Sequence, residues 1–210
     1  MKLVLASNNA KKLLEMQALF GPLGLELVNQ GALGIPEAEE PHVTFVENAL
    51  AKARHASALS GFASMADDSG LCVEALGGAP GVLSARYATL FGREKSDAEN
   101  NRVLLEKMAE LRVKAAGHDV PRHARFVSAL VAVRSAQDPE PLVAFGRWEG
   151  ELLEEPRGEQ GFGYDPLLLI PALGRSVAEL DAVTKNAYSH RAIAARQMSA
   201  LMHEAWRLRA

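Results

Sequence analysis

The spacing of apolar residues predicts that strands and helices alternate in the first half of the chain. Residues 3–5 form a short apolar run typical of a buried strand, and the next segment repeats apolar residues at helical spacing. The apolar face of this helix is formed by four residues: Leu13, Met16, Leu19 and Phe20. Three charged residues on its other side are expected to face solvent or a ligand: Lys11, Lys12 and Glu15. Gly21-Pro22 is expected to end the helix, and a second strand follows at about 25–28.

Two capping-box patterns predict the starts of later helices. Thr44 is followed three residues later by Glu47, and the Ala-rich run after it predicts a helix to about residue 59. Ser96 is followed by Glu99 in the same way, which predicts an amphipathic helix to about residue 115.

The remaining apolar runs predict further strands and a terminal helix. Strands are expected at 62–66, 71–75, 126–133, 142–148 and 167–170, and a helix at 189–207. Residues 138–141 are expected to form a hairpin-like turn. Because strands and helices alternate at first and a hairpin follows, we expect an α/β fold with a mixed sheet in one domain over residues 1–210.

Composition narrows the function classes. The 210 residues are 48% hydrophobic and 23% charged, as is usual for a chain with a sizeable core. The net charge of −3 argues against a nucleic-acid-binding protein but permits a small phosphorylated ligand. Cys72 is the single cysteine, which excludes an intrachain disulfide and suits a reducing compartment. No apolar stretch approaches the ~20 residues of a membrane helix, so we expect no membrane partner and a cytoplasmic protein.

The segment Ser7-Asn8-Asn9-Ala10-Lys11-Lys12 runs from a strand end into a helix. Backbone N–H groups at such a helix start favour an anion, and Lys12 would complete a phosphate cradle. The segment lacks the glycines of both the Walker A loop and the dinucleotide-binding loop. Taken alone, it favours the plainer interpretation that Ser7 or Asn9 caps the helix.

Asp67 and Asp68 are adjacent carboxylates between two apolar runs. At a strand end one of them would point toward a buried cleft, where it needs a compensating cation such as Mg²⁺. A turn through Ser69-Gly70, with an aspartate as its cap, explains the same residues equally well. The acidic loop 37–40 would supply a second metal ligand or be an ordinary solvated surface.

Two later segments add ligand-binding chemistry. Residues 161–166 combine glycines that allow close backbone approach with two aromatics that can stack on a planar group. Lys185, His190 and Arg191 lie near the start of the last helix, where cations do not favour the helix dipole. Together these residue types indicate a Mg²⁺-nucleotide site.

Six motifs then carry a resemblance that covers the chain from Leu3 to Arg191. In order they are SNNAKKLLE, TFVENALAKARHA, ADDSGL, LGGAPGVLSARYA, GFGYDPL and SHR. The sequence closely resembles the noncanonical purine nucleoside triphosphate pyrophosphatases, the Ham1/RdgB-like inosine triphosphatase family. The resemblance implies an elongated mixed central sheet flanked by helices, two lobes with an active-site cleft between them, and a homodimer. It also implies a nucleotide-pool house-cleaning hydrolase that converts ITP, dITP and XTP to the monophosphate and pyrophosphate with Mg²⁺.

The resemblance also assigns residues motif by motif. Asp68 is implied as proton acceptor and metal ligand, Asp67 as its neighbour in the catalytic group, and Glu40, or alternatively Glu39, as the second metal ligand. The triphosphate is expected on Ser7, Asn8, Asn9, Ala10, Lys11 and Lys12, with Lys12 as the principal cation, and Ser69 is expected to touch substrate. The nucleoside pocket is expected from Phe162, Gly163, Tyr164 and Asp165, and further phosphate or base contacts from Lys185, His190 and Arg191.

Two departures and three alternatives accompany this resemblance. Thr184 stands where the family often has an acidic residue, and Ser128-Ala129 where it often has cysteine and aliphatics; neither is expected to touch a catalytic group. A Maf-like pyrophosphatase is disfavoured by GFGYD and SHR, and a noncatalytic nucleotide-binding regulator by the retained carboxylates. An RNA-binding role lacks its basic stripe with interleaved aromatics.

Overall fold

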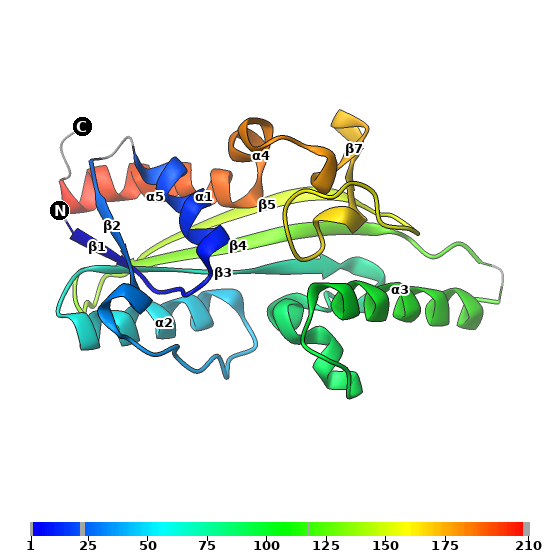
Figure 1. Cartoon of the computed structure of the whole chain (residues 1–210), viewed down its shortest axis with the longest axis horizontal. Helices are drawn as coiled ribbons and strands as arrows, with labels where there is room; N and C mark the ends of the chain where they lie inside the picture. Colours follow the sequence, from blue (N-terminus) through cyan, green and yellow to red (C-terminus); the bar gives the residue numbers. More distant parts are fainter. Residues whose placement is uncertain (1, 22–23, 117, 208–210) are drawn as a thin grey trace. The chain divides into compact units, whose positions relative to one another are not determined.

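The computed structural model describes residues 2–21, 24–116 and 118–207 and contains one mixed seven-stranded sheet (Figure 1). Its strands are β1 (Lys2–Leu5), β2 (Glu26–Asn29), β3 (Ser64–Val73), β4 (His123–Val133), β5 (Leu142–Leu152), β6 (Leu168–Ile170) and β7 (Arg175–Ser176). The strand order is β2-β1-β3-β4-β5-β6-β7. β1 pairs in parallel with β2 and β3, whereas β6 pairs antiparallel with β5 and β7. The expected α/β fold with a mixed sheet is therefore confirmed.

The two helices with capping-box patterns start where the sequence predicts. The α-helices of the described chain are α1 (Ala10–Phe20), α2 (Phe45–Ser60), α3 (Asp97–Lys114), α4 (Ala182–Tyr188) and α5 (His190–Trp206). Thr44 accepts a hydrogen bond from the Glu47 N–H at the start of α2, and Ser96 accepts one from the Glu99 N–H at the start of α3. α1 ends at Phe20, and Pro22, the other half of its predicted stop, lies outside the described residues.

The chain divides into two compact units. The first contains Met1–Asp68, Ser128–Gly146 and Asn186–Ala210, and the second contains Ser69–Val127 and Arg147–Lys185. The chain crosses from one unit to the other inside β3, β4 and β5.

In the first unit, alternate residues of the strands face different helices (Figure 1). Leu3, Leu5 and Met65 belong to an apolar cluster with α1 and α5. Their neighbours Val4, Ala6 and Ala66 belong to a second cluster with α2, which contributes Ala49, Ala53 and Ala56. This is the period-two alternation of a sheet covered on both faces.

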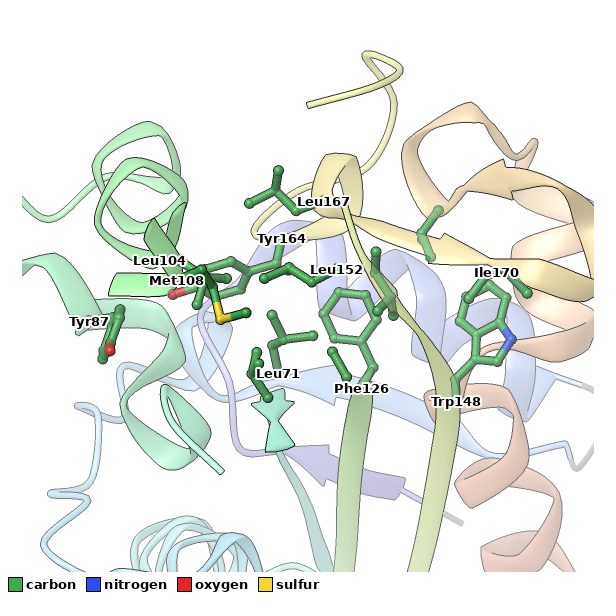
Figure 2. Packing of buried hydrophobic residues seen from close by; sticks show 14 of the residues in the cluster. Leu71, Tyr87, Leu104, Met108, Phe126, Trp148, Leu152, Tyr164, Leu167 and Ile170 are labelled. Atoms are coloured by element: carbon green, nitrogen blue, oxygen red, sulfur yellow. The ribbon is translucent and has the colours of Figure 1, made fainter. Parts of the chain in front are cut away.

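The core of the second unit is rich in aromatic residues (Figure 2). Leu71, Phe126 and Trp148 from the strands pack together with Leu104 and Met108 of α3. Tyr164 enters the same cluster from the loop before β6 and is only 3% exposed. The core therefore fixes both α3 and the glycine-rich loop 161–165.

The predicted break at Ser69-Gly70 is wrong, because β3 is one continuous strand through both aspartates. A Cβ atom at Gly70 would lie 2.3 Å from Ser84 Oγ and 2.4 Å from the Gly81 carbonyl oxygen. The glycine is therefore required by close approach of another segment, a common reason for glycine inside a strand.

Some elements were not expected from the sequence. The 3₁₀ segment Gly81–Phe91, the short strand β7 and the separate helix α4 are examples. Lys185 lies in α4, which ends shortly before α5 begins, while His190 and Arg191 are the first two residues of α5. No helix in the described ranges has the length and apolar character needed to span a membrane.

Gly146 of β5 sets how closely α5 approaches the first unit's sheet. An added Cβ would lie 1.8 Å from the His190 carbonyl oxygen and 2.8 Å from the Ala194 nitrogen. We therefore predict that Gly146→Ala lowers the free energy of unfolding by about 2–3 kcal/mol, because backbone atoms cannot move aside cheaply. Chemical denaturation would measure this, with Gly21→Ala as control because no described residue beyond its chain neighbours has an atom within 4 Å of a Cβ there. Equal stability of the two variants would contradict the prediction.

Candidate active site

The pleat of β3 sends its two aspartates to opposite faces of the sheet. Met65 packs against α1 and α5, and Ala66 packs against α2. Because side chains alternate along a strand, Asp67 points to the same face as Met65 and Asp68 to the same face as Ala66. Each carboxylate accordingly meets cations from the helix or helices covering its own face.

Asp67 is buried and fully occupied by ionic and hydrogen bonds. Its Oδ2 lies 3.0 Å from both Lys12 Nζ and Arg191 Nε, and its Oδ1 accepts a 2.7 Å hydrogen bond from Ser128 Oγ. Burial would raise the pKa of Asp67, but the charges of Lys12 and Arg191 outweigh it and hold that pKa well below its usual value. Burial also lowers the pKa of Lys12, despite its pairing with Asp67.

A second carboxylate completes this buried network. Glu15 Oε2 lies 2.9 Å from Arg191 Nη1, and Arg191 itself is only 4% exposed. Glu15 follows Lys12 by three residues, so α1 supplies one charge of each sign to the same cluster. Lys12 and Glu15 therefore face the buried charges of Asp67 and Arg191 rather than open solvent, and their contact with a ligand stays a prediction.

Asp68 pairs with a different lysine. Lys52 Nζ of α2 lies 2.7 Å from Asp68 Oδ1 and 2.7 Å from Glu40 Oε1. Burial would lower the pKa of Lys52, but the two carboxylates raise it above its usual value. Burial raises the pKa of Asp68, which Lys52 offsets only in part. The other oxygen, Asp68 Oδ2, is buried and has no hydrogen-bond partner within the described part of the chain.

The two lysines converge on one carbonyl oxygen. Lys52 Nζ lies 3.1 Å and Lys12 Nζ 3.5 Å from the main-chain oxygen of Asp67. β1 ends at Leu5, and the Ala6 N–H still bonds the Met65 carbonyl oxygen at 2.8 Å. Past this point the lysines take the place of β1 beside the middle of β3, at the carboxyl end of β1. Ligands of open α/β sheets bind at such ends, and two ammonium groups there favour an anion.

The loop that carries Glu40 is fastened to α2. The Asn48 side chain accepts a 3.0 Å hydrogen bond from the His42 N–H and donates a 3.1 Å bond to the His42 carbonyl oxygen. Asn48 and Lys52 are four residues apart and therefore share a helix face. Glu40 reaches Lys52, whereas Glu39 is exposed.

The start of α1 is capped by its own side chains. Asn9 Oδ1 accepts hydrogen bonds from the N–H groups of Lys11 and Lys12, at 3.0 and 3.1 Å, and Ser7 Oγ accepts one from Asn9. The interpretation that Asn9 caps the helix is thus correct for the N–H groups of Lys11 and Lys12. Asn8, Ala10 and Lys11 are exposed on the same turn.

The glycine-rich loop forms a second group of predicted site residues, within the second unit. Asp165 Oδ2 accepts hydrogen bonds from the Phe162 N–H at 3.0 Å and from Lys185 Nζ at 2.8 Å. Lys185 Nζ also lies 4.9 Å from the centroid of the Phe162 ring. The Tyr164 side chain points into the core, where its hydroxyl donates to the Ser84 carbonyl oxygen and burial raises its pKa.

Two predicted residues have simpler surroundings. Ser69 is half-buried in β3 directly after Asp68, at the first position of the second unit. His190 is buried in the first turn of α5, whose cap is Ser189.

Sequence reasoning missed Lys52, Glu15 and Ser128 as members of the site. Lys52 was detectable, because it stands at helical spacing from Ala49 and Ala56 and so lies on the buried face of α2. The expectation that Ser128 touches no proposed catalytic group is wrong, since it donates to Asp67.

The chain is similar to known proteins along nearly its whole length. The model of the Ham1 family matches residues 3–201. A protein from Leptothrix cholodnii named dITP/XTP pyrophosphatase is 63% identical, over 99% of this chain and 100% of its own. One of the same name from Methylibium petroleiphilum is 61% identical over 98% and 99%. The solved structure of a HAM1 protein from Coxiella burnetii has a TM-score of 0.86 and 44% identity, and covers 97% of this chain and 99% of its own.

The resemblance seen in the six motifs is thereby confirmed over nearly the whole chain, which belongs to the Ham1 family.

Proposed function

We propose that this protein is a nucleoside triphosphate pyrophosphatase that hydrolyses dITP, XTP and ITP to the monophosphate and pyrophosphate. Its enzyme class and its role in cleaning the nucleotide pool agree with the names of its full-length relatives. One structural observation supports the chemistry most strongly. Lys12 and Lys52 converge on the Asp67 carbonyl oxygen, beside Asp68 Oδ2, which has no hydrogen-bond partner among the described residues.

The lysines bind the triphosphate. Both ammonium groups already stand near the carboxyl end of β1, beside the middle of β3, so they stabilise phosphate charge without having to be repositioned. Asp67 and Arg191 hold Lys12 in place through the buried network. As the phosphorus–oxygen bond breaks, Lys12 and Lys52 stabilise the charge that develops on the pyrophosphate, with Lys185 as a further cation.

Asp68 orients and deprotonates the attacking water. Its Oδ1 is anchored by Lys52, while Oδ2 has no partner within the described residues and is able to accept a proton. Asp67 is unsuited to this role because three side chains occupy its oxygens. The two aspartates therefore divide support and proton transfer between them.

Asp68 and Glu40 suit a hard divalent cation, and we propose Mg²⁺. Both carboxylates meet at Lys52, and Asp68 Oδ2 supplies an oxygen ligand that no described residue satisfies. The described chain contains no group of three or more metal-binding side chains, which suits an ion usually held by one or two carboxylates plus substrate phosphates. When bound, the ion supplies charge neutralisation for the triphosphate.

The loop 161–165 and Lys185 are proposed to bind the nucleoside. The Phe162 ring stacks on the base, and donors in this group meet the 6-keto oxygen that hypoxanthine and xanthine share. Adenine carries an amino group at that position, which leaves a buried donor unpaired and so rejects ATP. Ser69 and His190 complete the substrate contacts in this proposal.

A homodimer and a cytoplasmic location are also part of the proposal. The resemblance to the family supports both. Membership of the Ham1 family sets aside a Maf-like enzyme, and a noncatalytic nucleotide-binding regulator would bind nucleotide without turnover.

The first prediction concerns substrate and product. We expect rapid turnover of dITP, XTP and ITP and much slower turnover of ATP, because only the keto bases match the donors. Coupled assays for pyrophosphate and orthophosphate, run in parallel with Mg²⁺, would measure this. Release of orthophosphate would contradict the proposed bond cleavage, and binding without turnover would support the regulator instead.

The second prediction separates the two aspartates. Asp68→Asn removes the proton acceptor, so kcat should fall by roughly 100- to 10,000-fold while the fold is retained. Asp67→Asn leaves buried cations uncompensated, so the free energy of unfolding should fall by about 3 kcal/mol. Steady-state kinetics and chemical denaturation on both variants test this. Near-normal turnover by Asp68→Asn would exclude Asp68 as the base.

The third prediction distinguishes the two candidate metal ligands. Glu40→Gln should raise the Mg²⁺ concentration needed for half-maximal activity by about tenfold, because one charged ligand is lost. Glu39→Gln is the matched control, since Glu39 is exposed one residue away. The same ranking should appear in Mn²⁺ binding followed by electron paramagnetic resonance without nucleotide. An effect confined to Glu39→Gln would reverse the assignment.

A further inference from the structure

Helix α3 holds the glycine-rich loop of the second unit through the main-chain N–H and carbonyl groups of Gly163. The Gly163 N–H donates to Asp97 Oδ2 at 2.8 Å, and the Gly163 carbonyl oxygen accepts from Asn101 Nδ2 at 3.0 Å. We infer that Asp97 and Asn101 are positioning residues that set the nucleobase contacts of loop 161–165. This inference rests on the proposed function, because it assumes that this loop binds the base.

The two anchoring side chains act as one unit. Asp97 and Asn101 are four residues apart, so they project from the same face of α3. The bond to Asp97 involves a carboxylate, which makes it stronger than a bond between neutral groups. Gly163 has a φ of +62°, a conformation that side-chain-bearing residues adopt with strain. Anchoring such a residue on both sides fixes the direction in which the chain enters and leaves it.

Fixing Gly163 also fixes the aromatic ring beside it. Phe162 stands between two anchored amides, since its own N–H donates to Asp165 and the next N–H donates to Asp97. Its ring lies over Lys185 Nζ, which is itself bound to Asp165. Asp165 is part of the loop, so its bond to Phe162 cannot hold the loop in place from outside. The anchors on α3 do so.

Helix α3 is a rigid support for this purpose. Ser96 caps its start, Asn100 accepts a 2.8 Å hydrogen bond from the Ala88 N–H, and Leu104 lies in the core. On the far side of Gly163, Tyr164 is packed in the same core (Figure 2). Gly163 is thus tied to a helix that is capped at its start and packed in the core.

The amide of Asn101 is only half satisfied. Its Oδ1 is buried and has no hydrogen-bond partner within the described residues. A buried oxygen without a partner opposes folding, so stability alone does not explain this asparagine. Removing it should change the unfolding free energy little, which lets its effect on nucleotide binding be measured separately.

The experiment compares Asn101→Ala and Asp97→Ala with the full-length wild type. We expect KM for dITP to rise roughly five- to twentyfold in each, from loss of one hydrogen bond, with kcat within about twofold. Inorganic tripolyphosphate, as competitive inhibitor, should keep its Ki because it lacks the base. Asp97→Asn, which retains an acceptor oxygen, should recover part of the affinity. An unchanged KM, or a Ki that rises as much as KM, would overturn the inference.

Asn100→Ala is the matched control, since it removes an amide bond from the same turn of α3 but not from the loop. Its KM should stay within twofold of the wild-type value, and an increase equal to that of Asn101→Ala would point to general damage. Calorimetric titration with dITP in the presence of a chelator repeats the comparison without turnover. A wild type that binds dITP without hydrolysing it would defeat the proposed function while still testing the anchors. A wild type that does neither would defeat both.

Discussion

Two neighbouring carboxylates lie on one buried strand, and this can be stable only because the pleat separates them and each finds its own cations. A buried charge left without a partner is strongly destabilising. Asp67 therefore requires Lys12 and Arg191 on the face covered by α1 and α5, while Asp68 requires Lys52 on the face covered by α2. This requirement ties three helices of the first unit to the middle of β3. The small alanines of α2 and the glycine at 146 allow α2 and α5 to come close enough.

The same arrangement gives identical side chains different chemistry. Asp67 is surrounded by two cations and a hydroxyl donor, which hold its pKa down. Asp68 pairs with Lys52, which also binds Glu40, and burial raises the pKa of Asp68. Environments that move the pKa values of two carboxylates in opposite directions allow a protein to give them different acid–base roles at neutral pH. The order of residues in β3 thus sets the division of labour.

What could be predicted from the sequence was governed by local physics. Helix starts at Thr44 and Ser96 depend on side chains three residues away, so they were predicted correctly. Gly70 was interpreted as part of a turn, because the contact that requires a glycine there is with Ser84, which lies in another segment. Glu15 and Arg191 are 176 positions apart, and no spacing rule connects them. The motif resemblance brought Arg191 into the site, but only the fold shows that it binds Asp67.

The two units use one method to position loops that carry ligand-binding groups. Asn48 of α2 binds both polar main-chain groups of His42, near Glu40, and the pair on α3 binds both of Gly163, next to Phe162. In each case a helix side chain holds the backbone of the loop rather than its side chains. The side chains proposed to meet the ligand, Glu40 and Phe162, stand two residues and one residue from the anchored main chain. Charged pairs, by contrast, hold the residues of β3 directly, where a shift of the carboxylate itself would alter the reaction.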